Sequence, residues 1–155
     1  ELSSLDTNNI KITDILSPTQ NSYPDTNNAV SIIIENYSTN PQDSFIVQYS
    51  IDDGNTFVSE VCLDTIQPFD TLVYNFSATA NMSHIALYNC IFTVNNTGDT
   101  INNDDTLKLD IWKGEVFHGN YTIGISTIAD FSSISSACRA IENFGISDST
   151  TFTLS

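Results

Sequence analysis

Seven segments between residues 10 and 112 have the character of β-strands, some because apolar side chains recur at every second residue and others, such as residues 30–37, because they are rich in β-branched residues. Because successive side chains of a β-strand point to opposite faces of the sheet, this alternation predicts strands with one buried face. The seven segments are residues 10–16, 30–37, 45–51, 56–63, 71–76, 84–94 and 106–112. Turn-forming residues separate them at near-regular spacing and no helical pattern lies among them, so the sequence predicts an all-β sandwich.

The hairpin expected from residues 84–94 and 106–112 organises the rest of the chain. One face of its first strand carries Tyr88, Cys90, Phe92 and Val94, and one face of its second carries Leu107, Leu109 and Ile111. These two faces are expected to meet in one core. Short strands in this number and spacing are typical of an immunoglobulin-like β-sandwich, which we expect over residues 10–112. The expected core comprises Ile12, Ile32, Ile34, Val47, Tyr49, Leu72, Tyr74, Phe76, Tyr88, Phe92, Leu107 and Leu109.

The charge balance restricts the partners of the chain. Its formal net charge is -15, with 4 Lys and Arg residues against 19 Asp and Glu residues. Proteins bind nucleic acid and anionic membrane surfaces through basic patches, so the sequence argues against both partners. No apolar run approaches the roughly 20 residues of a membrane span, so direct membrane insertion is not expected either. Low Lys and Arg contents with abundant Asp, Asn, Ser and Thr are typical of exported bacterial modules, and we expect an extracellular or cell-surface location.

The cysteines show neither a metal-ligand spacing nor a C-x-x-C pair. There are three, Cys62, Cys90 and Cys138, and the odd number leaves at least one free thiol unless two chains pair with each other. Cys90 lies on the inward face of its expected strand. It is there either a buried apolar thiol or the disulfide partner of Cys62, and the sequence leaves both alternatives open.

Beyond residue 112 the pattern changes from strand to helix. Residues 113–120 are expected to be a connector. In residues 130–145 apolar side chains recur at spacings of three and four, which predicts a helix. The residues on this apolar face are Phe131, Ile134, Cys138 and Ile141. Asp130 suits the N-cap of the helix, and Gly145 suits the position just past its C-terminus.

The domain organisation follows from these elements. Residues 1–9 are a polar lead-in without the charged and apolar regions of a signal peptide, so we expect a chain that is mature or cut from a longer protein. Residues 10–112 form the sandwich, and residues 121–155 form a strand-helix-strand appendage that ends in the strand-like residues 150–155. The expected fold class is therefore mainly β: a seven-stranded immunoglobulin-like β-sandwich with a C-terminal strand-helix-strand appendage.

The sandwich region resembles a known family. Residues 59–77 carry a proline turn ahead of a Thr-x-x-Tyr-x-Phe strand, and a Gly-Asp and Asn-Asp loop follows at residues 98–104. Together with Leu87-Tyr88, these motifs resemble the CARDB-type immunoglobulin-like modules of secreted bacterial surface proteins. The resemblance covers roughly residues 10–112, and Phe69 stands where the family more often has glycine.

The C-terminal region is similar to a second pattern. Residues 119–124, Asp130-Phe131, the expected helix, Gly145-Ile146 and residues 150–152 resemble the N-terminal cap of right-handed parallel β-helix domains. Such caps occur in large secreted proteins of gliding, type IX-secreting bacteria, where a short strand and a helix precede the first coil. The resemblance implies one piece, or one repeat, of a long multidomain protein at the surface of a Gram-negative bacterium.

The acidic turn between the last two expected strands of the sandwich is the candidate metal site. Its oxygen-bearing side chains are Asp99, Asn102, Asn103, Asp104 and Asp105. A hard cation such as Ca²⁺ prefers oxygen ligands of this kind, although the spacing is not that of an EF-hand loop. The alternative is a solvated loop whose Asx side chains bond their own backbone. Asp52, Asp53 and Asn55 form a weaker set that the hairpin turn alone explains, and no other cofactor is expected.

The sequence predicts no catalytic constellation. It contains no G-x-S-x-G elbow, His84 and His118 lie far apart, and the few glutamates show no sign of an apolar pocket. We therefore predict that the chain is not an enzyme. Trp112 is expected on the outward face of its strand. There it either stacks on a sugar ring or packs under the C-terminal helix, near Phe131 and Ile134, and fixes the angle between the two segments.

These observations favour a non-catalytic structural or adhesive module that acts as a spacer, a contact surface or an assembly repeat. Its expected partners are neighbouring domains of the same protein, other copies of it, or a surface glycan. The alternative is an accessory module of a polysaccharide-active β-helix enzyme. A candidate assembly strand is formed by Thr150, Thr151, Phe152, Thr153 and Leu154, because a strand with unpaired backbone groups is a template for another chain. Otherwise this strand pairs with residues 121–125 of its own chain.

Overall fold

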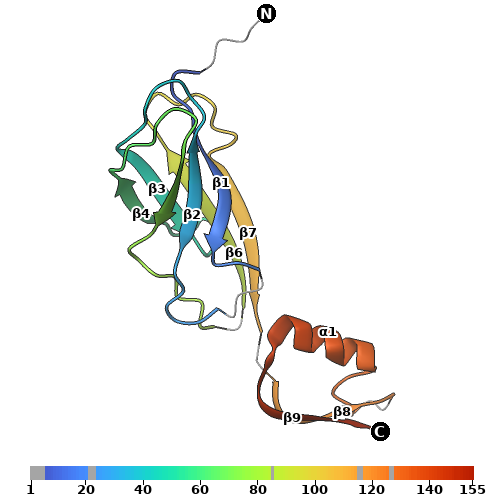
Figure 1. The fold of residues 1–155 in the computed structure, drawn as a ribbon. Coiled ribbons are helices and arrows are strands. Elements are labelled where there is room, and N and C mark those ends of the chain that lie inside the picture. Colours follow the sequence, from blue (N-terminus) through green and yellow to red (C-terminus); the bar gives the residue numbers. More distant parts are fainter. Residues whose placement is uncertain (1–5, 21–23, 85, 115–116, 126–127) are drawn as a thin grey trace, which may run out of the picture. The chain divides into compact units, whose positions relative to one another are not determined.

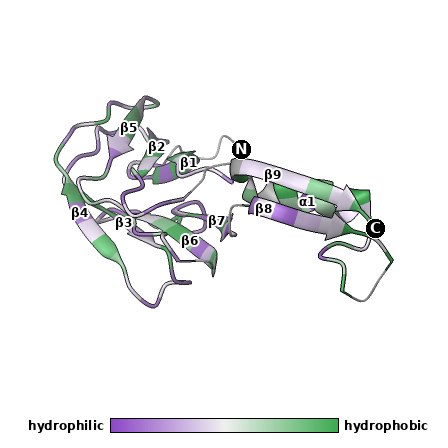
Figure 2. Cartoon of the chain, turned by 90° about the horizontal axis from the view of Figure 1, so that it is seen from below, coloured by the Kyte–Doolittle hydropathy of each residue, from purple (hydrophilic) through white to green (hydrophobic). Residues whose placement is uncertain are grey.

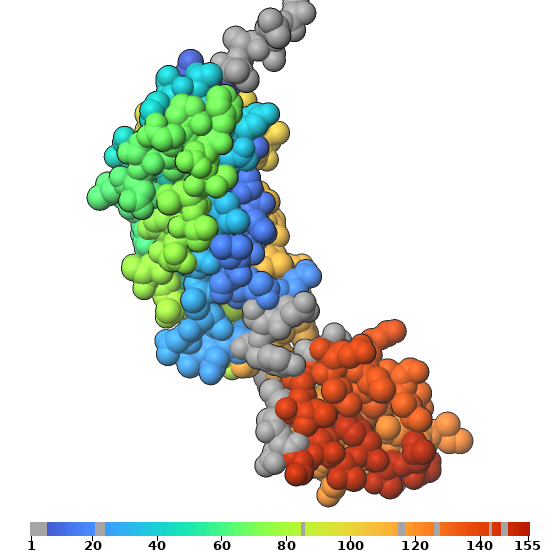
Figure 3. Space-filling view, viewed as in Figure 1, coloured from blue at the N-terminus to red at the C-terminus, as the bar shows by residue number. Residues whose placement is uncertain are grey.

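The chain folds into two compact units. The computed structural model describes residues 6–20, 24–84, 86–114, 117–125 and 128–155, apart from the side chains of residues 143, 147 and 148. The first unit comprises Glu1–Ser83 and Leu87–Ile111, and the second comprises His84–Ala86 and Trp112–Ser155. Figure 1 shows their elements, and Figure 3 shows the same units in space-filling form, the first in blue to gold and the second in orange to red.

Two sheets make up the first unit. A three-stranded sheet has the order β1 (Ile10–Ser17), β2 (Ser31–Asn36) and β5 (Thr71–Asn75). A four-stranded sheet has the order β4 (Val58–Cys62), β3 (Phe45–Ser50), β6 (Ala86–Asn95) and β7 (Thr106–Lys113). The pairs β1–β2, β2–β5, β3–β4 and β3–β6 are antiparallel. The prediction of a mainly β chain is therefore confirmed, and the fold of this unit is sandwich-like.

The core of the first unit lies between the inward faces of its sheets. Ile32 and Ile34 of β2 are 0% exposed, as is Val47 of β3. The rings of Tyr49 and Phe76 meet edge to face with their centroids 5.0 Å apart, which joins β3 to the segment after β5. Burial alternates along β6, since Tyr88, Cys90, Phe92 and Val94 are buried and the residues between them are only partly so, as a strand with one buried face requires. Figure 2 shows that β6 carries both hydrophobic and hydrophilic residues.

Four residues of the expected core are not fully buried. Leu72 and Tyr74 of β5 and Leu107 and Leu109 of β7 are of intermediate burial. Both strands lie at an edge of their sheet, so each inward face has a neighbouring strand on one side only. Period-two alternation identifies the inward face but not the position of a strand within its sheet. This is the physical reason why the core prediction was wrong at these positions.

The second unit is built on a parallel strand pair. It contains β8 (Phe117–Ile123), α1 (Ile134–Phe144) and β9 (Ile146–Leu154). In the register of β8 with β9, Tyr121 pairs with Phe152 and Ile123 pairs with Leu154. Parallel strands need a long crossover connection, and the segment containing α1 supplies it. Since β8 begins at Phe117, the expected connector over residues 113–120 already contains the start of a strand.

Aromatic rings fill the core of this unit. Phe117 contacts Tyr121, Phe131 and Phe144 with ring centroids 5.1, 5.6 and 6.2 Å away. Phe152 stacks on Tyr121 at 5.6 Å. Rings of both strands, of the helix and of the loop before it therefore meet in one cluster.

The helix begins later than the sequence predicted. Its N-cap is Ser133, whose side chain accepts a hydrogen bond from the backbone N–H of Ser136, while the Ser136 hydroxyl bonds back to the N–H of Ser133. This reciprocal capping box satisfies helix donors that would otherwise be unpaired. Asp130 has another role, because its carboxylate accepts hydrogen bonds from the Thr122 N–H at 2.8 Å and the Thr122 hydroxyl at 2.9 Å.

The buried face of α1 also differs from the prediction. Ala137 is 2% exposed, whereas Cys138 is exposed and Ile134 is 57% exposed. Phe144, in the last turn, contacts the aromatic cluster. Neighbouring helical positions are turned by about 100°, so burial of Ala137 directs Cys138 away from the strands. The prediction assumed that every apolar residue at a spacing of three or four was inward, and it was wrong for Ile134 and Cys138.

Candidate functional site

The acidic turn connects β6 with β7 and lies against the start of β1. Asp99 connects the turn to β1. Its Oδ2 accepts a 2.8 Å hydrogen bond from the N–H of Ile10 in β1, and its Oδ1 accepts a 2.9 Å hydrogen bond from the N–H of Ile101 in the turn. The backbone of the turn is fixed as well. The carbonyl of Asp104 accepts from Ile12, and the carbonyl of Asp105 accepts from Val94.

Asn9, the residue just before β1, reaches the same place. Its Nδ2 lies 3.5 Å from Oδ2 of Asp104, 95 positions further along the chain. Sequence reasoning placed Asn9 in a polar lead-in and missed this contact. No local signal in the sequence indicates it, because only the packing of β1 against the last hairpin brings the two segments together.

Three buried side-chain oxygens at this place accept no hydrogen bond within the described part of the chain: Asn9 Oδ1, Asp104 Oδ1 and Asp105 Oδ1. Asn9 is 2% exposed and Asp105 is 8% exposed. Most buried polar atoms in proteins have a partner, and leaving one without a partner costs about 1–3 kcal/mol. Burial, together with the charges of Asp99 and Asp104, raises the pKa of Asp105 to about 6.

Asn102 and Asn103, the other two members of the predicted set, are exposed. Asn102 and Asp105 both line an open pocket of about 380 Å³. Across the described residues, no three His, Cys, Asp or Glu side chains form a metal-binding group on their own. Of the predicted set, Asp104 and Asp105 each have a buried oxygen without a donor, Asn102 and Asn103 are exposed, and Asn9 lies beside Asp104.

The weaker candidate at residues 52–55 is a closed turn. Asp52 accepts hydrogen bonds from the Ser50 hydroxyl at 2.7 Å, from the Thr56 N–H at 2.9 Å and from the Thr56 hydroxyl at 2.6 Å. The hydrogen bonds from Thr56, followed by the one from Ser50, lower the pKa of this carboxyl to about 2. Protein donors already occupy the Asp52 carboxylate, as the hairpin explanation requires.

Glu60 on β4 is an anchored carboxylate that sequence reasoning treated as unremarkable. It accepts hydrogen bonds from the Tyr74 hydroxyl at 2.8 Å, from the Ser77 N–H at 2.9 Å and hydroxyl at 2.7 Å, and from the Ala78 N–H at 3.2 Å. Partial burial alone would raise the pKa of Glu60, but the hydrogen bonds from Ser77, Tyr74 and Ala78 hold it below its ordinary value. The carboxylate joins the edge strands of the two sheets.

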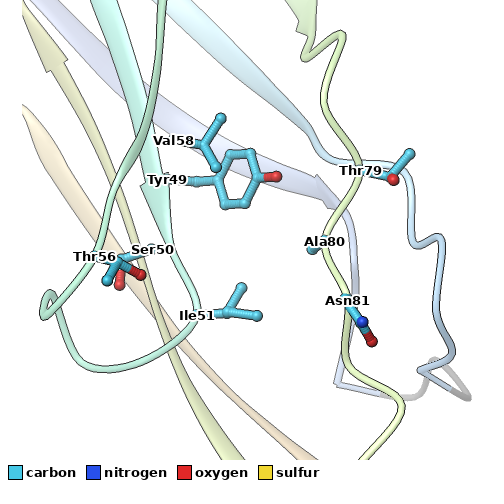
Figure 4. Close-up of a pocket in the computed structure, with 8 residues that line it drawn as sticks. All are labelled: Tyr49, Ser50, Ile51, Thr56, Val58, Thr79, Ala80 and Asn81. Carbon is cyan, nitrogen blue, oxygen red and sulfur yellow. The ribbon is translucent and has the colours of Figure 1, made fainter.

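A small pocket of about 150 Å³ opens beside Tyr49 (Figure 4). Its other lining residues are Ser50, Ile51, Thr56, Val58, Thr79, Ala80 and Asn81. The Tyr49 hydroxyl donates a 3.3 Å hydrogen bond to the carbonyl of Ala78, and burial followed by the nearby Glu60 charge raises the pKa of this phenol. The lining offers hydroxyl, amide and apolar groups, which suit packing more than acid-base chemistry.

All three cysteines are free thiols in the structure. Cys62 and Cys90 are buried and Cys138 is exposed, so the alternative of a bridge between the first two is not adopted. Burial, with a smaller effect of the Asp110 charge, raises the pKa of Cys90 to about 11. A thiol with such a pKa stays protonated near neutral pH and is a poor nucleophile.

Two of the three residues expected to pack between the two segments, Trp112 and Phe131, have ring contacts in the second unit. The Trp112 ring lies 6.2 Å from that of Phe144 and is 49% exposed. Phe131 belongs to the aromatic cluster, at 5.9 Å from Phe152, whereas Ile134 is mostly exposed. The predicted assembly residues 150–154 lie in β9, which pairs with β8 of the same chain.

No model of a known protein family matches the sequence, and a search of curated proteins finds none that is significantly similar. Among the described residues there is no helix with the length and apolar character needed to cross a bilayer. The resemblance to CARDB-type modules and to β-helix caps therefore stays a prediction.

Proposed function

We propose that this chain is a non-catalytic structural or adhesive module of a large exported bacterial protein. The observation that carries the proposal is the succession of two compact units along one chain, each with its own core. Long surface proteins are built from such serial units, which keep functional surfaces at a distance from the cell. In this proposal the first unit has immunoglobulin-like topology and serves as a spacer or contact surface.

Exposed apolar residues support a contact role for the first unit. Val61 and Leu63, at the end of edge strand β4, are 56% and 77% exposed, and Ile46, the partner of Val61 on β3, is 41% exposed. An edge strand offers unpaired backbone groups together with its side chains. Neighbouring domains of the same protein, or a second copy, are the partners that such a surface suits.

Light scattering across a concentration series tests the proposal on the intact chain. Because β9 is paired within its own chain, we expect a monomer at all concentrations, as for a spacer. Growing mass would instead identify an assembly repeat. Two charge-introducing variants then locate the contact, Leu154→Asp on β9 and Val61→Asp on β4, since both side chains are exposed and neither supports a core. Turnover of any polysaccharide by the chain would contradict a non-catalytic role.

One observation favours a second function, that of an accessory module of a polysaccharide-active β-helix enzyme. The parallel pairing of β8 with β9 across α1 is the strand geometry on which parallel β-helices are built. A glycan-binding screen of the intact chain separates the two proposals. One saturable polysaccharide ligand, whose affinity falls in a Trp112→Ala variant, would favour the accessory module. Absence of saturable binding would favour the spacer.

A further inference from the structure

The oxygen cluster at the start of β1 contains acceptors that the chain itself leaves without donors. Asn9 Oδ1, Asp104 Oδ1 and Asp105 Oδ1 are buried, and no hydrogen bond reaches them within the described residues. Asn9 is the independent part of this observation, because it belongs to the segment before β1 and not to the acidic turn. A 98% buried amide would normally direct its oxygen at a donor.

The side chain of Asn9 lies beside that of Asp104, and β1 begins beside the acidic turn. The Asn9 amide nitrogen lies 3.5 Å from one oxygen of Asp104, and the next residue, Ile10, donates its N–H to Asp99 at 2.8 Å. Asp105 follows Asp104 directly in the chain, and one oxygen of its carboxylate is buried. Asn9 and two consecutive carboxylates thus each have a buried oxygen without a hydrogen-bond donor where β1 begins.

We propose that Asn9, Asp104 and Asp105 bind a hard divalent cation, Ca²⁺, with Asp99 adding negative charge beside it. The donors are one amide oxygen and carboxylate oxygens, without nitrogen or sulfur ligands among them. Hard cations prefer such donors, and Ca²⁺ accepts amide oxygens and irregular geometry more readily than Mg²⁺, which needs a near-octahedral shell. Water would complete the shell, so three converging acids are not required.

The cation has a structural role in this proposal. It connects the start of β1 to the turn between β6 and β7, segments that are 95 positions apart at Asn9 and Asp104. A ligand that binds only the folded state stabilises that state according to its free concentration and dissociation constant. The first unit is therefore expected to be most stable against unfolding in solutions that contain calcium, such as those outside a cell.

Calorimetric titration and thermal unfolding of the intact, chelator-treated chain test the site, with Ca²⁺ alone as the probe and Mg²⁺ for comparison. The buffer contains about 150 mM NaCl, which screens diffuse attraction to the net charge of -15. We expect one saturable Ca²⁺ site. The unfolding temperature is expected to rise by about 5 °C or more at a Ca²⁺ concentration far above the dissociation constant, with a smaller rise in Mg²⁺.

Three variants distinguish this site from general charge effects. Asp105→Asn and Asp53→Asn remove the same charge, one from the cluster and one from an exposed hairpin position. Asp105→Asn is expected to weaken Ca²⁺ binding by about tenfold or more, whereas Asp53→Asn leaves it unchanged. Asn9→Ala removes the amide ligand without altering charge and is also expected to weaken binding. If Asn9→Ala does not fold, the comparison of Asp105→Asn with Asp53→Asn decides alone.

Two results would overturn the proposal. One is the absence of saturable Ca²⁺ binding to the unmodified chain. The other is equal weakening by Asp105→Asn and Asp53→Asn, which would mean that Ca²⁺ responds to overall charge. Since Asp105→Asn also relieves repulsion in the cation-free cluster, its unfolding temperature without Ca²⁺ is expected to equal or exceed that of the unmodified chain. A folded variant that no longer responds to Ca²⁺ therefore identifies the ligand directly.

Discussion

The hydroxyl of Tyr74 donates a 2.8 Å hydrogen bond to the carboxylate of Glu60. Tyr74 lies on β5 and Glu60 on β4, which are edge strands of different sheets. Backbone hydrogen bonds join strands within a sheet but not the two stacked sheets. The side-chain bond from Tyr74 to Glu60 therefore connects an edge of one sheet to an edge of the other. Hydrogen bonds from Ser77 and Ala78 to the same carboxylate extend the closure beyond the end of β5.

Removing the Tyr74 hydroxyl is expected to lower the free energy of unfolding. Tyr74→Phe should cost about 1.5 kcal/mol, the lower end of the range for a hydrogen bond to a charged group. Glu60→Ala should cost about 2–3 kcal/mol, because Ser77 and Ala78 lose their bonds to the carboxylate as well. Urea unfolding followed by far-UV circular dichroism measures both, with exposed Ser59→Ala as the control on β4. Additive losses in the double variant would show that the pair does not interact.

Glu60 also predicts how stability depends on pH. The pKa of its carboxyl is lowered in the folded chain, so the charged form favours folding. This contribution is complete above the unfolded pKa of about 4.3 and is lost as the pH falls through the lower folded value. The stability difference between the unmodified chain and Glu60→Gln should therefore shrink between pH 6 and pH 3. A difference that stays constant over this range would contradict the prediction.

Thiol chemistry should distinguish the three cysteines. Cys138 is exposed, whereas Cys62 and Cys90 are buried and burial raises the pKa of both thiols. A thiol reagent added at neutral pH is expected to label one cysteine in the folded chain and all three in urea. Cys138→Ser should abolish labelling of the folded chain. Rapid labelling of three thiols without denaturant would show that the first unit opens more readily than its packing implies.

The capping box of α1 predicts a local loss of stability. Ser133→Ala removes the acceptor for the Ser136 N–H and should cost about 1 kcal/mol in the second unit. Neighbouring Ser132→Ala serves as the matched control, since Ser132 is exposed and lies outside the helix. The fluorescence of Trp112, the single tryptophan, reports on this unit through its contact with Phe144. Equal effects of the two variants would mean that the cap does not limit the stability of the helix.

Local pattern predicted much of the strand layout because alternation is a local property. The faces carrying Val47 and Phe92 are buried as expected. The sequence could not reveal that β5 and β7 are edge strands, since sheet order depends on pairing between distant segments. For the same reason Leu72 and Leu109 were placed too deep in the core.

The candidate site shows the same division between local and distant information. The acidic turn is visible in the sequence as a run of Asp and Asn, and Asp105 and one oxygen of Asp104 are buried. Asn9 and Glu60 were missed because their partners lie 95 and 14 positions away or more. The start of α1 was misplaced because Asp130 and Ser133 are both good caps, and the bonds of Asp130 to Thr122 decide between them.

Strand β7 carries neighbouring side chains that belong to different units. Ile111 is fully buried in the first unit, and Trp112 contacts Phe144 in the second. Because adjacent positions of a strand face opposite ways, inserting or deleting one residue shortly before them would exchange their directions. Evolution can therefore lengthen the surface loops of either unit with little effect, but at this junction single-residue insertions and deletions are expected to be counter-selected. Gene fusions that reuse one unit without the other should preserve which residues of β7 face the core of the first unit.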